Sequence, residues 1–593
     1  MLNFSRLLAA LVWGGWVSGA IAPAVAFGSM SPPPILTQQS PVQQGNQIVL
    51  NGRVIAGAWR QWAGANSSQV GISDAVLVNA FGVQLLNTDV PSRQPIQWFT
   101  PNNQIQNLTT QLSPTLRYLD VSDLARQSGW QLRTNGPNLE IATPATRIVG
   151  LRQSQQPWGD RLVLELNQPT PWQTNQRLQE LQLVLEAQID PTLSQQFKPV
   201  AGRFLNTIAL EPSGNQTRLR FNMTNASARV WSVAAPNRIV IDIRPDALTE
   251  QNILWAPGLH WRQQIVSLGA TRIPTVWLEV NPRQPGIVLQ PLLPTPGTMT
   301  GIAPLLQTAR QAQVAAAING GFFNRNRQLP LGAIRLNGEW LSGPILNRGA
   351  IAWDHSGNVL FSRLTLQETV VTPTGQRLPL THLNSGYVQA GIARYTAAWG
   401  PFYTALSDGE IVVVVQNNQV TSQQVLEQAG TASPPIPVNG YLLVLRSNRS
   451  ATSVFPPGAV LKLESTANQP DFLRYPHVLG AGPLLLQNQQ IVLDAKAESF
   501  SNAFAIETAS RSAIAQRADG RLLLVTAHAR LDGGGLSLMD MAQLLLQLGA
   551  VNALNLDGGS STTLYLGGQI RDRPAGTAAR VHNGFGIFLK GNP

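Results

Sequence analysis

At 593 residues the chain is too long to fold around one hydrophobic core, and this length constrains its architecture more than any single motif does. Domains hold roughly 150 residues on average, so about four structural units are expected. Apolar residues make up 43% of the sequence, which is enough to give each unit a buried core. We therefore expect a multidomain globular protein.

Charge and cysteine content narrow the possible functions. Charged residues are only 12% of the chain, and the net charge of +11 is spread along the sequence instead of being concentrated in basic runs. A dispersed charge argues against nucleic-acid binding and fits an anionic glycan, a phosphate polymer or an envelope surface. There is no cysteine, which excludes disulfides, thiolate metal sites and cysteine nucleophiles.

The N-terminus carries targeting signals. One basic residue, Arg6, precedes an apolar stretch from Leu7 to Val25, and Ala24-Val25-Ala26 is a small-x-small cleavage pattern. We predict a signal peptide over residues 1–26 and, because proline and glutamine are frequent after it, a linker over 27–46. An uncleaved membrane anchor is the alternative. After cleavage, the protein is expected in the periplasm or cell envelope of a bacterium, without a transmembrane span.

Two small, mostly β modules are predicted next. In residues 47–145, YLDVSDLARQSGWQLRTNGPNLEIA predicts a helix, a strand, a hairpin turn at Asn135-Gly136 and a second strand. In residues 146–247, RLVLELN, LQLVLEA, TRLRFNM and NRIVIDIRP alternate as half-buried strands of a small sheet do. The first module resembles the copper-amine-oxidase N-terminal-like (stalk) domain and the second an AMIN domain. These resemblances imply attachment to peptidoglycan or envelope polysaccharide, so removing both modules should preserve turnover of a small substrate.

Over residues 253–593 the pattern changes to strands interspersed with helices and glycine-rich turns. This pattern predicts an α+β domain with a mixed sheet, which we expect to be catalytic. One helix is expected from Ile302 to Gln313. A second is expected after Ser537, which can form a capping box with Asp540.

Two strand ends followed by glycines are candidate binding loops. The strand Ala553 to Leu556 leads into Asp557-Gly558-Gly559-Ser560-Ser561-Thr562-Thr563, and an apolar run leads into Asn319-Gly320-Gly321-Phe322-Phe323. Glycine turns let backbone N–H groups approach an anion, and hydroxyl and amide side chains add further hydrogen bonds. The first segment also fits a plain hairpin turn, and the second also fits a turn whose phenylalanine pair packs in the core.

Further candidates lie in three other segments. Arg511 precedes an apolar strand, and a guanidinium can hold two phosphate oxygens. His528 and Arg530 end the strand LLLVTAHAR, just before three glycines, and Gly482 lies in a glycine-rich turn before a leucine run. Taken alone, each also fits a structural role as a solvated charge or a turn residue.

Together these segments resemble the phosphodiester glycosidases. AINGGFFN, IPVNGYLLV, LGAGPLLLQNQQ, SRSAIAQRADGRLLLV, GLSLMDMAQLLLQLGAVNALNLDGGSSTTLY and ARVHNGFGIFL follow the family's order, over about Trp261 to Leu589. LNLDGGSS with its preceding helix is the most specific part. The chain departs from the family at Ala527-His528-Ala529-Arg530, where relatives often have Asp-Gly-Arg, and at GGSS, where others have GGGS.

The resemblance implies an exported hydrolase that cleaves a sugar from a glycosyl phosphodiester. Its catalytic residues would be Asp557, Arg511 and His528, with Asp557 activating water or stabilising an oxocarbenium-like carbon and Arg511 binding phosphate. Asn319 and Arg580 would orient the substrate. The full set of expected substrate-binding residues is Asn319, Gly320, Gly321, Gly482, Arg530, Gly558, Gly559, Ser560, Ser561 and Arg580.

Two other functions stay open from the sequence. The two N-terminal modules also fit a non-catalytic envelope-binding protein, and the loops also fit a phosphodiesterase that attacks phosphorus. No cluster of histidines and carboxylates has metal-ligand spacing, so neither a transition-metal site nor a cofactor is expected. A Ca²⁺ or Mg²⁺ ion held by carbonyl groups would leave no signal in the sequence.

Overall fold

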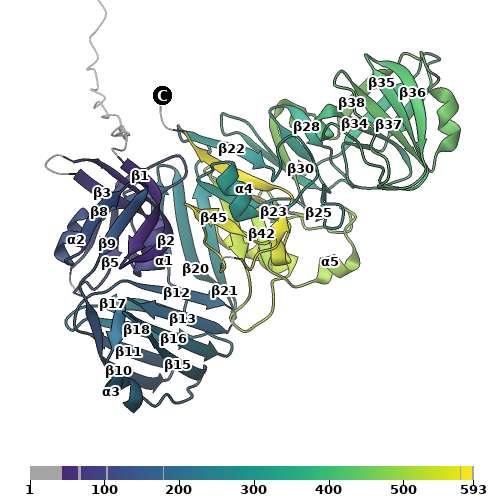
Figure 1. The fold of residues 1–593 in the computed structure, drawn as a ribbon. Coiled ribbons are helices and arrows are strands. Elements are labelled where there is room, and N and C mark those ends of the chain that lie inside the picture. Colours follow the sequence, from purple (N-terminus) through teal and green to yellow (C-terminus); the bar gives the residue numbers. More distant parts are fainter. Residues whose placement is uncertain (1–42, 65–67, 102–103, 178, 575, 591–593) are drawn as a thin grey trace, which may run out of the picture. The chain divides into compact units, whose positions relative to one another are not determined.

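The computed structural model is half strand and only 11% helix. It describes residues 43–593 except 65–67, 102–103, 178, 575 and 591–593 (Figure 1). The predicted signal peptide lies outside the described residues, and β1 begins at Gln43, within the predicted linker. No helix among the described residues is long and apolar enough to cross a membrane.

The predicted α+β class of the C-terminal region is wrong, because this region is mostly β. Its helices are short: α4 (Leu305–Gln311), α5 (Asn502–Ile506) and α6 (Leu538–Gln547). The eight-stranded sheet of this region and the five-stranded sheet that begins with Ile287–Leu292 are not mixed, because their described pairings are all antiparallel. A parallel pair joins His382–Leu383 to Gly391–Thr396 in another sheet. Antiparallel neighbours can be joined by hairpins, so crossover helices are not needed.

The N-terminal module is a nine-stranded sheet with two short helices, α1 (Asp74–Phe81) and α2 (Ser122–Gln127). The predicted helix, strand, hairpin and strand are confirmed as α2, β8 and β9, with Gly136 at a φ of 56° in the turn. In sheet order the strands are β4 (Gln84–Leu85), β5 (Arg93–Gln97), β6 (Gln106–Leu112), β7 (Arg117–Asp120), β3 (Ser68–Ser73), β2 (Arg53–Ala63), β1 (Gln43–Leu50), β9 (Asn138–Ala142) and β8 (Gln131–Asn135).

The next module contains two sheets where the sequence predicts one. The four predicted strands exist, but alternation shows only that one face of each strand is buried, and it does not show which strands pair. One sheet holds β14 (Ala187–Ile189), β10 (Thr146–Gln156), β11 (Gly159–Leu166), β18 (Arg238–Arg244) and β17 (Ser227–Val233). The other holds β12 (Trp172–Arg177), β13 (Glu180–Leu185), β16 (Gln216–Met223) and β15 (Leu205–Ser213), and α3 (Pro191–Gln196) lies between β14 and β15 in the chain.

Two sheets of the C-terminal region combine strands that are far apart in sequence, visible in Figure 1 as teal strands among yellow ones. Their side chains share one hydrophobic cluster. The eight-stranded sheet holds β19 (Gln251–Ala256), β20 (Leu259–Leu268), β21 (Thr271–Val280), β43 (Leu522–Ala527), β42 (Arg511–Arg517), β44 (Ala550–Asn555), β40 (Leu484–Gln487) and β41 (Gln490–Ile491). The five-stranded sheet holds β22 (Ile287–Leu292), β48 (Gly584–Leu589), β24 (Ala316–Asn319), β45 (Leu564–Leu566) and β46 (Gln569–Ile570).

Smaller sheets complete this region. One five-stranded sheet holds β28 (Glu339–Ser342), β27 (Ile334–Leu336), β39 (His477–Gly480), β29 (Gly349–Trp353) and β30 (Val359–Arg363). Another holds β33 (His382–Leu383), β34 (Gly391–Thr396), β37 (Gly440–Arg446), β35 (Glu410–Gln416) and β36 (Gln419–Leu426). The remaining sheets are β32 (Arg377–Leu380), β31 (Leu366–Val371) and β38 (Lys462–Ala467), then β23 (Ala303–Pro304) with β47 (Arg580–Val581), and β25 (Phe323–Asn324) with β26 (Leu329–Pro330).

Helix α6 sets the position of the strand that carries the most specific motif. Its capping box is confirmed, because the Ser537 hydroxyl accepts from the Asp540 N–H at 3.0 Å and the Asp540 carboxylate accepts from the Ser537 N–H at 2.9 Å. A cap of this kind stabilises a helix by about 1 kcal/mol. Gly549, at a φ of 83°, ends the helix in the left-handed conformation. The buried face of α6 packs on the eight-stranded sheet, and the chain continues into β44.

Candidate functional site

Four strand ends meet at one edge of the C-terminal sheets. In the antiparallel pairing, Arg511 at the start of β42 lies opposite Ala527 at the end of β43. The end of β44 pairs with β42 through Asn555 and Ala513. Asp557 therefore follows β44, and His528 follows β43, at the edge where β42 begins. Strand β24 of the five-stranded sheet ends there too, because its last residue hydrogen-bonds to the Asp557 segment.

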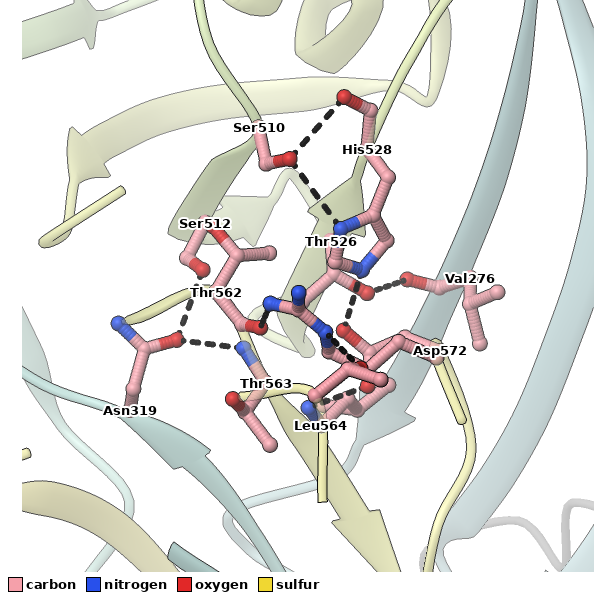
Figure 2. A network of polar contacts seen from close by, with 12 residues as sticks. Val276, Asn319, Ser510, Ser512, Thr526, His528, Thr562, Thr563, Leu564 and Asp572 are labelled. Atoms are coloured by element: carbon pink, nitrogen blue, oxygen red, sulfur yellow. Dashed lines mark hydrogen bonds and ion pairs between the residues drawn. The ribbon is translucent and has the colours of Figure 1, made fainter. Parts of the chain in front are cut away.

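That last residue, Asn319, is fully buried and holds the loops of the site together. Its amide nitrogen donates to the Asp557 carbonyl at 2.7 Å. Its amide oxygen accepts from the Ser512 hydroxyl at 2.7 Å and from the Thr563 N–H at 3.0 Å (Figure 2). Both ends of the amide are thus bonded to the protein. Asn319 is therefore placed to orient the Asp557 loop, whereas the sequence led us to expect that it contacts the substrate.

The two glycines after Asn319 allow a close approach of backbones. The Gly320 carbonyl accepts from the Asp557 N–H at 2.9 Å, and the Gly321 N–H donates to the Asn583 side chain at 2.7 Å. A Cβ atom on Gly321 would lie 2.1 Å from the Gly480 carbonyl oxygen, which leaves no room for a side chain. These glycines therefore fix the loop in which Asp557 sits.

Asp557 is half-buried, and burial raises the pKa of its carboxyl from 3.8 to about 6. The Ser561 hydroxyl, the positive charge of Arg325 and the Gly558 N–H partly oppose this rise of the pKa. A carboxyl group with a pKa of about 6 is mostly ionised at neutral pH and still takes up a proton readily. Asp557 is therefore suited to accept a proton from water.

The turn after Asp557 is held by backbone bonds. The Gly559 N–H donates to the Ser510 carbonyl at 2.7 Å, and Gly559 has a φ of 61°. Ser561 is fully buried, whereas Ser560 is exposed, and the Ser560 hydroxyl accepts from Arg325 at 3.2 Å. Only part of the predicted hydroxyl-rich loop is thus open to a ligand.

Arg511 is buried directly beside this turn, with 1% of its surface exposed. Its Nε donates to the Leu536 carbonyl at 3.0 Å and its Nη2 to the Glu507 carbonyl. A Cβ atom built on Gly558 would lie 3.8 Å from Arg511 Nη1. Burial lowers the pKa of Arg511, and the charges of Glu507 and Asp540 partly oppose this. None of the ion pairs among the described residues involves Arg511, so no carboxylate within ion-pair distance neutralises its charge.

Two further arginines, which sequence reasoning missed, lie at the same site. The guanidinium of Arg348 lies 4.1 Å from the ring centroid of Phe500 and 5.6 Å from that of Phe322. Phe504 stacks on Phe500 with centroids 4.6 Å apart, and Arg511 lies 5.8 Å from the Phe504 centroid. This cluster of three partly exposed rings therefore connects Arg348 to Arg511.

The second missed arginine is Arg325, which contacts Ser560. A signal for it exists in the sequence, because NRNR directly follows the NGGFF segment. For Arg348 the signal is weak, since LNRGA resembles any charged turn.

His528 lies between two polar residues that the sequence did not single out. Its Nε2 is 2.7 Å from Asp572 Oδ2, and its Nδ1 is 3.3 Å from the Ser510 hydroxyl (Figure 2). The Asp572 side chain is fully buried, and its other oxygen accepts from the Leu564 N–H at 2.8 Å. Asp572 therefore fixes the orientation of the ring, and His528 reaches the site through Ser510, whose carbonyl holds Gly559.

Three predicted residues make no contact with Asp557 among the described residues, although a Cβ atom on Gly482 would lie 3.2 Å from the Phe500 ring. The Gly482 N–H donates to the Asn555 carbonyl at 3.0 Å, at the entry to β40. Arg530 bonds within its own turn, to the Gly533 carbonyl at 3.2 Å, and Arg580 is exposed on β47. No contact among the described residues joins Arg530 or Arg580 to Asp557. Among all the residues that the structure describes, no three histidine, aspartate or glutamate side chains are grouped so that they could hold a metal ion.

Residues 406–588 match the phosphodiester glycosidase family. This confirms the resemblance for that region, which includes Arg511, His528, Asp557 and Asp572. Two curated relatives are N-acetylglucosamine-1-phosphodiester alpha-N-acetylglucosaminidases. The Mus musculus protein is 37% identical over 91 residues, and the Homo sapiens protein is 39% identical over 77 residues. These matches cover 15% and 13% of this chain, and only 17% and 15% of the relatives' own length.

A solved structure covers far more of the chain. The crystal structure of a hypothetical protein from Synechocystis is 43% identical to this chain, with a TM-score of 0.86. The match covers 93% of this chain and 100% of that one. The two proteins therefore belong to one family, and they share the N-terminal modules as well as the C-terminal sheets.

Proposed function

We propose that this chain, whose residues 406–588 match the phosphodiester glycosidases, is a hydrolase that cleaves a sugar from a glycosyl phosphodiester. One observation carries the proposal. Asp557, a carboxyl group whose pKa burial raises to about 6, lies at the same strand edge as Arg511, whose buried charge forms no ion pair among the described residues. A base next to an unpaired cation suits a substrate that contains both a reacting carbon and an anion.

The phosphate is assigned to the arginines. Arg511 lies beside the Gly558 turn, Arg348 lies over Phe500, and Arg325 reaches Ser560 from the exposed side. Guanidinium groups bind phosphate oxygens in pairs, and partial burial strengthens the attraction. The partly exposed rings of Phe322 and Phe500 supply an apolar wall for the sugar ring.

In the proposed reaction, water attacks the anomeric carbon and gives a proton to Asp557. The bond between this carbon and the phosphate oxygen breaks, and its electron pair stays on the oxygen. The products are a free sugar and a phosphomonoester, and Asp557 then releases its proton to solvent. Because a phosphate is an acidic leaving group, little proton donation to it is needed, and charge stabilisation by the arginines is the larger contribution. With a pKa of about 6, Asp557 is ionised in a ratio of about ten to one at pH 7.

His528 is assigned an indirect part in this reaction. Both ring nitrogens are engaged, one by Asp572 and one by Ser510. The Ser510 hydroxyl also donates to the His528 carbonyl at 3.1 Å, so the ring acts on the site by holding Ser510, whose carbonyl accepts from the Gly559 N–H.

The site of action is proposed to be the bacterial envelope. The apolar stretch from Leu7 to Val25 and the Ala24-Val25-Ala26 pattern support export, and the two N-terminal modules support attachment to peptidoglycan or envelope polysaccharide. Export predicts a mature protein that starts at Phe27, and N-terminal sequencing of the exported protein tests this. An intact Met1 on that protein would contradict cleavage.

The reaction is tested by hydrolysis of a chromogenic glycosyl phosphodiester in heavy-oxygen water, with Asp557→Asn as the background control. Label in the sugar is expected, because water attacks carbon. Label in the phosphate would replace the proposal with a phosphodiesterase that attacks phosphorus. The wild-type protein could also fold and bind envelope glycan but release the chromophore no faster than Asp557→Asn. That result would favour the non-catalytic binding protein.

A further inference from the structure

A buried ion cluster links the N-terminal module to the C-terminal region. Asp74, the first residue of α1, accepts from the Trp255 indole at 2.7 Å and from Arg117 Nε at 3.2 Å, both at Oδ2. Its Oδ1 lies 3.5 Å from Arg571 Nη2. The side chains of Asp74 and Arg117 are 0% exposed and that of Arg571 is 3% exposed.

The charges in this cluster do not balance, because two guanidinium groups share one carboxylate. Burial lowers the pKa of Arg571 to about 10, Asp74 opposes this change, and Arg117 adds to it. Among the described residues, Asp74 is the ion-pair partner of both arginines. Without the Asp74 charge, two like charges would remain buried side by side, which is strongly unfavourable. Arg571 would then lose the ion pair that holds its side chain in this position.

Any movement of Arg571 reaches the site through the next two residues. Asp572 holds the His528 ring at 2.7 Å and the Leu564 N–H at 2.8 Å. Arg573 donates through Nη1 to the Ser560 carbonyl at 3.2 Å and to the Thr562 carbonyl at 3.0 Å. Three consecutive residues thus connect the N-terminal module, the histidine and the loop after Asp557.

The turn just before these residues also rests against the same cluster. A Cβ atom on Gly567 would lie 2.8 Å from the Trp255 ring, and one on Gly568 would lie 3.0 Å from Leu116 of the N-terminal module. The hairpin formed by β45 and β46 is therefore held by packing contacts at its tip as well as by the ion pair of Arg571. It has little freedom to shift while these contacts persist.

We propose that the N-terminal module is a positioning element of the active site, in which Asp74 acts through Arg571 to hold Asp572, Arg573 and the 558–562 loop in place. This role adds to attachment, which is all that the sequence indicated for the module. It implies that the C-terminal region without the module turns over substrate poorly, the opposite of the sequence-based expectation. A test of this role by substrate turnover rests on the proposed function, whereas a test by hydrogen exchange of the backbone does not.

The test is Asp74→Asn in the full-length protein, because asparagine keeps the shape and removes the charge. We expect kcat to fall by about ten-fold to a hundred-fold, with a smaller change in KM, since misplaced catalytic groups weaken mainly transition-state binding. Hydrogen exchange of the peptides that cover residues 558–573 should become faster.

The matched control is Asp160→Asn. Asp160 is also buried in the N-terminal half, at 1% exposure, and accepts backbone N–H groups of Arg203, Phe204 and Leu205 at 2.8, 2.7 and 2.9 Å. This variant should lower stability while leaving kcat and exchange at 558–573 unchanged. Equal losses of kcat in both variants would mean that general destabilisation is responsible, and would overturn the proposal.

A second variant covers the case in which Asp74→Asn does not fold. Arg571→Met breaks the same link from the other side, and the double variant should lose no more kcat than either single one, because both remove one interaction. Wild-type kcat and wild-type exchange at 558–573 in a folded Asp74→Asn or Arg571→Met protein would overturn the positioning role. An inactive wild-type enzyme would instead overturn the proposed function, and the exchange measurement would still decide the positioning role.

Discussion

Two carboxylates of the C-terminal region have opposite surroundings. Glu410, on β35, is fully buried and is matched by Arg446, whose Nε donates to it at 2.7 Å. It also accepts from the Tyr403 hydroxyl at 2.6 Å and from both the N–H and the hydroxyl of Ser407 at 3.0 Å. Asp557, in contrast, is half-buried, and its pKa is raised because burial outweighs the groups that stabilise its charge.

The difference indicates which carboxylate serves structure and which serves chemistry. A buried carboxylate that the fold matches with a cation and several donors fixes the packing around it, and it has no capacity left for a substrate. A carboxylate that the fold leaves partly unmatched can change its protonation state near neutral pH. Substitutions at the two positions should therefore have opposite effects on stability and turnover.

The largest effect is expected for Glu410→Gln. Breaking one side of a buried ion pair leaves the Arg446 charge uncompensated, so the free energy of unfolding should fall by about 3–5 kcal/mol. Chemical denaturation measures this loss, and kcat per folded molecule should stay at the wild-type value. Glu464→Gln, at the exposed pair with Arg377, is the control and should change stability little. Loss of turnover at unchanged stability would place Glu410 in the catalytic machinery.

The second-largest effect is expected for Asp557→Asn, and it concerns catalytic activity. Removing the base should lower kcat/KM by about a hundred-fold or more, because asparagine cannot take up the proton from water. Asp519→Asn, on an exposed turn, is the charge-matched control and should retain full activity. Steady-state assays on a glycosyl phosphodiester measure both. Near-normal activity of a folded Asp557→Asn protein would make Asp557 a turn residue.

The same variant should gain stability at high pH. The fold raises the pKa of Asp557 from 3.8 to about 6, so between these values the folded chain binds more protons than the unfolded chain. Wild-type stability therefore falls as pH rises through this window. We expect Asp557→Asn to be more stable than the wild type at pH 8, with the gain shrinking as pH falls through 6. A variant less stable than the wild type at pH 8 would contradict a desolvated carboxylate.

The sequence predicts the parts of this site that are encoded locally. The capping box of α6, the apolar strand and the glycine turn lie in one continuous segment, so the position of Asp557 at a strand end follows from pattern alone. The fold class of the C-terminal region does not follow from the sequence pattern, because short apolar runs between glycines suit either a helix or a strand. In the structure these apolar runs are strands, because they pair antiparallel with segments that are distant in the sequence.

Contacts between distant segments account for what the sequence could not predict. Asp572 reaches His528 because the hairpin of β45 and β46 turns the chain back, over 44 residues of separation. Asn319 has the residue type of a sugar ligand, but Ser512 and Thr563 use its amide oxygen once the two sheets are packed. Residue type indicates what a side chain can bind, and only the packing shows whether a ligand can reach it.

The smallest effect is expected for Arg325→Ala, and it separates tuning of Asp557 from binding of phosphate. The charge of Arg325 lowers the pKa of Asp557, so its removal should raise that pKa. Activity that requires ionised Asp557 is lost below its pKa, and the acidic limb of the kcat/KM profile should therefore move to higher pH, by less than about one unit. Since Arg325 is exposed, the shift should shrink in high salt.

Arg327→Ala removes an equal charge from the same loop and is the matched control, with an acidic limb that should stay at the wild-type pH. If Arg325 also contacts phosphate beside Ser560, KM should rise in Arg325→Ala at every pH, independently of the movement of the limb. A rise in KM with an unmoved limb would assign Arg325 to substrate alone. In that case burial by itself, without tuning by a nearby charge, would set the protonation of Asp557.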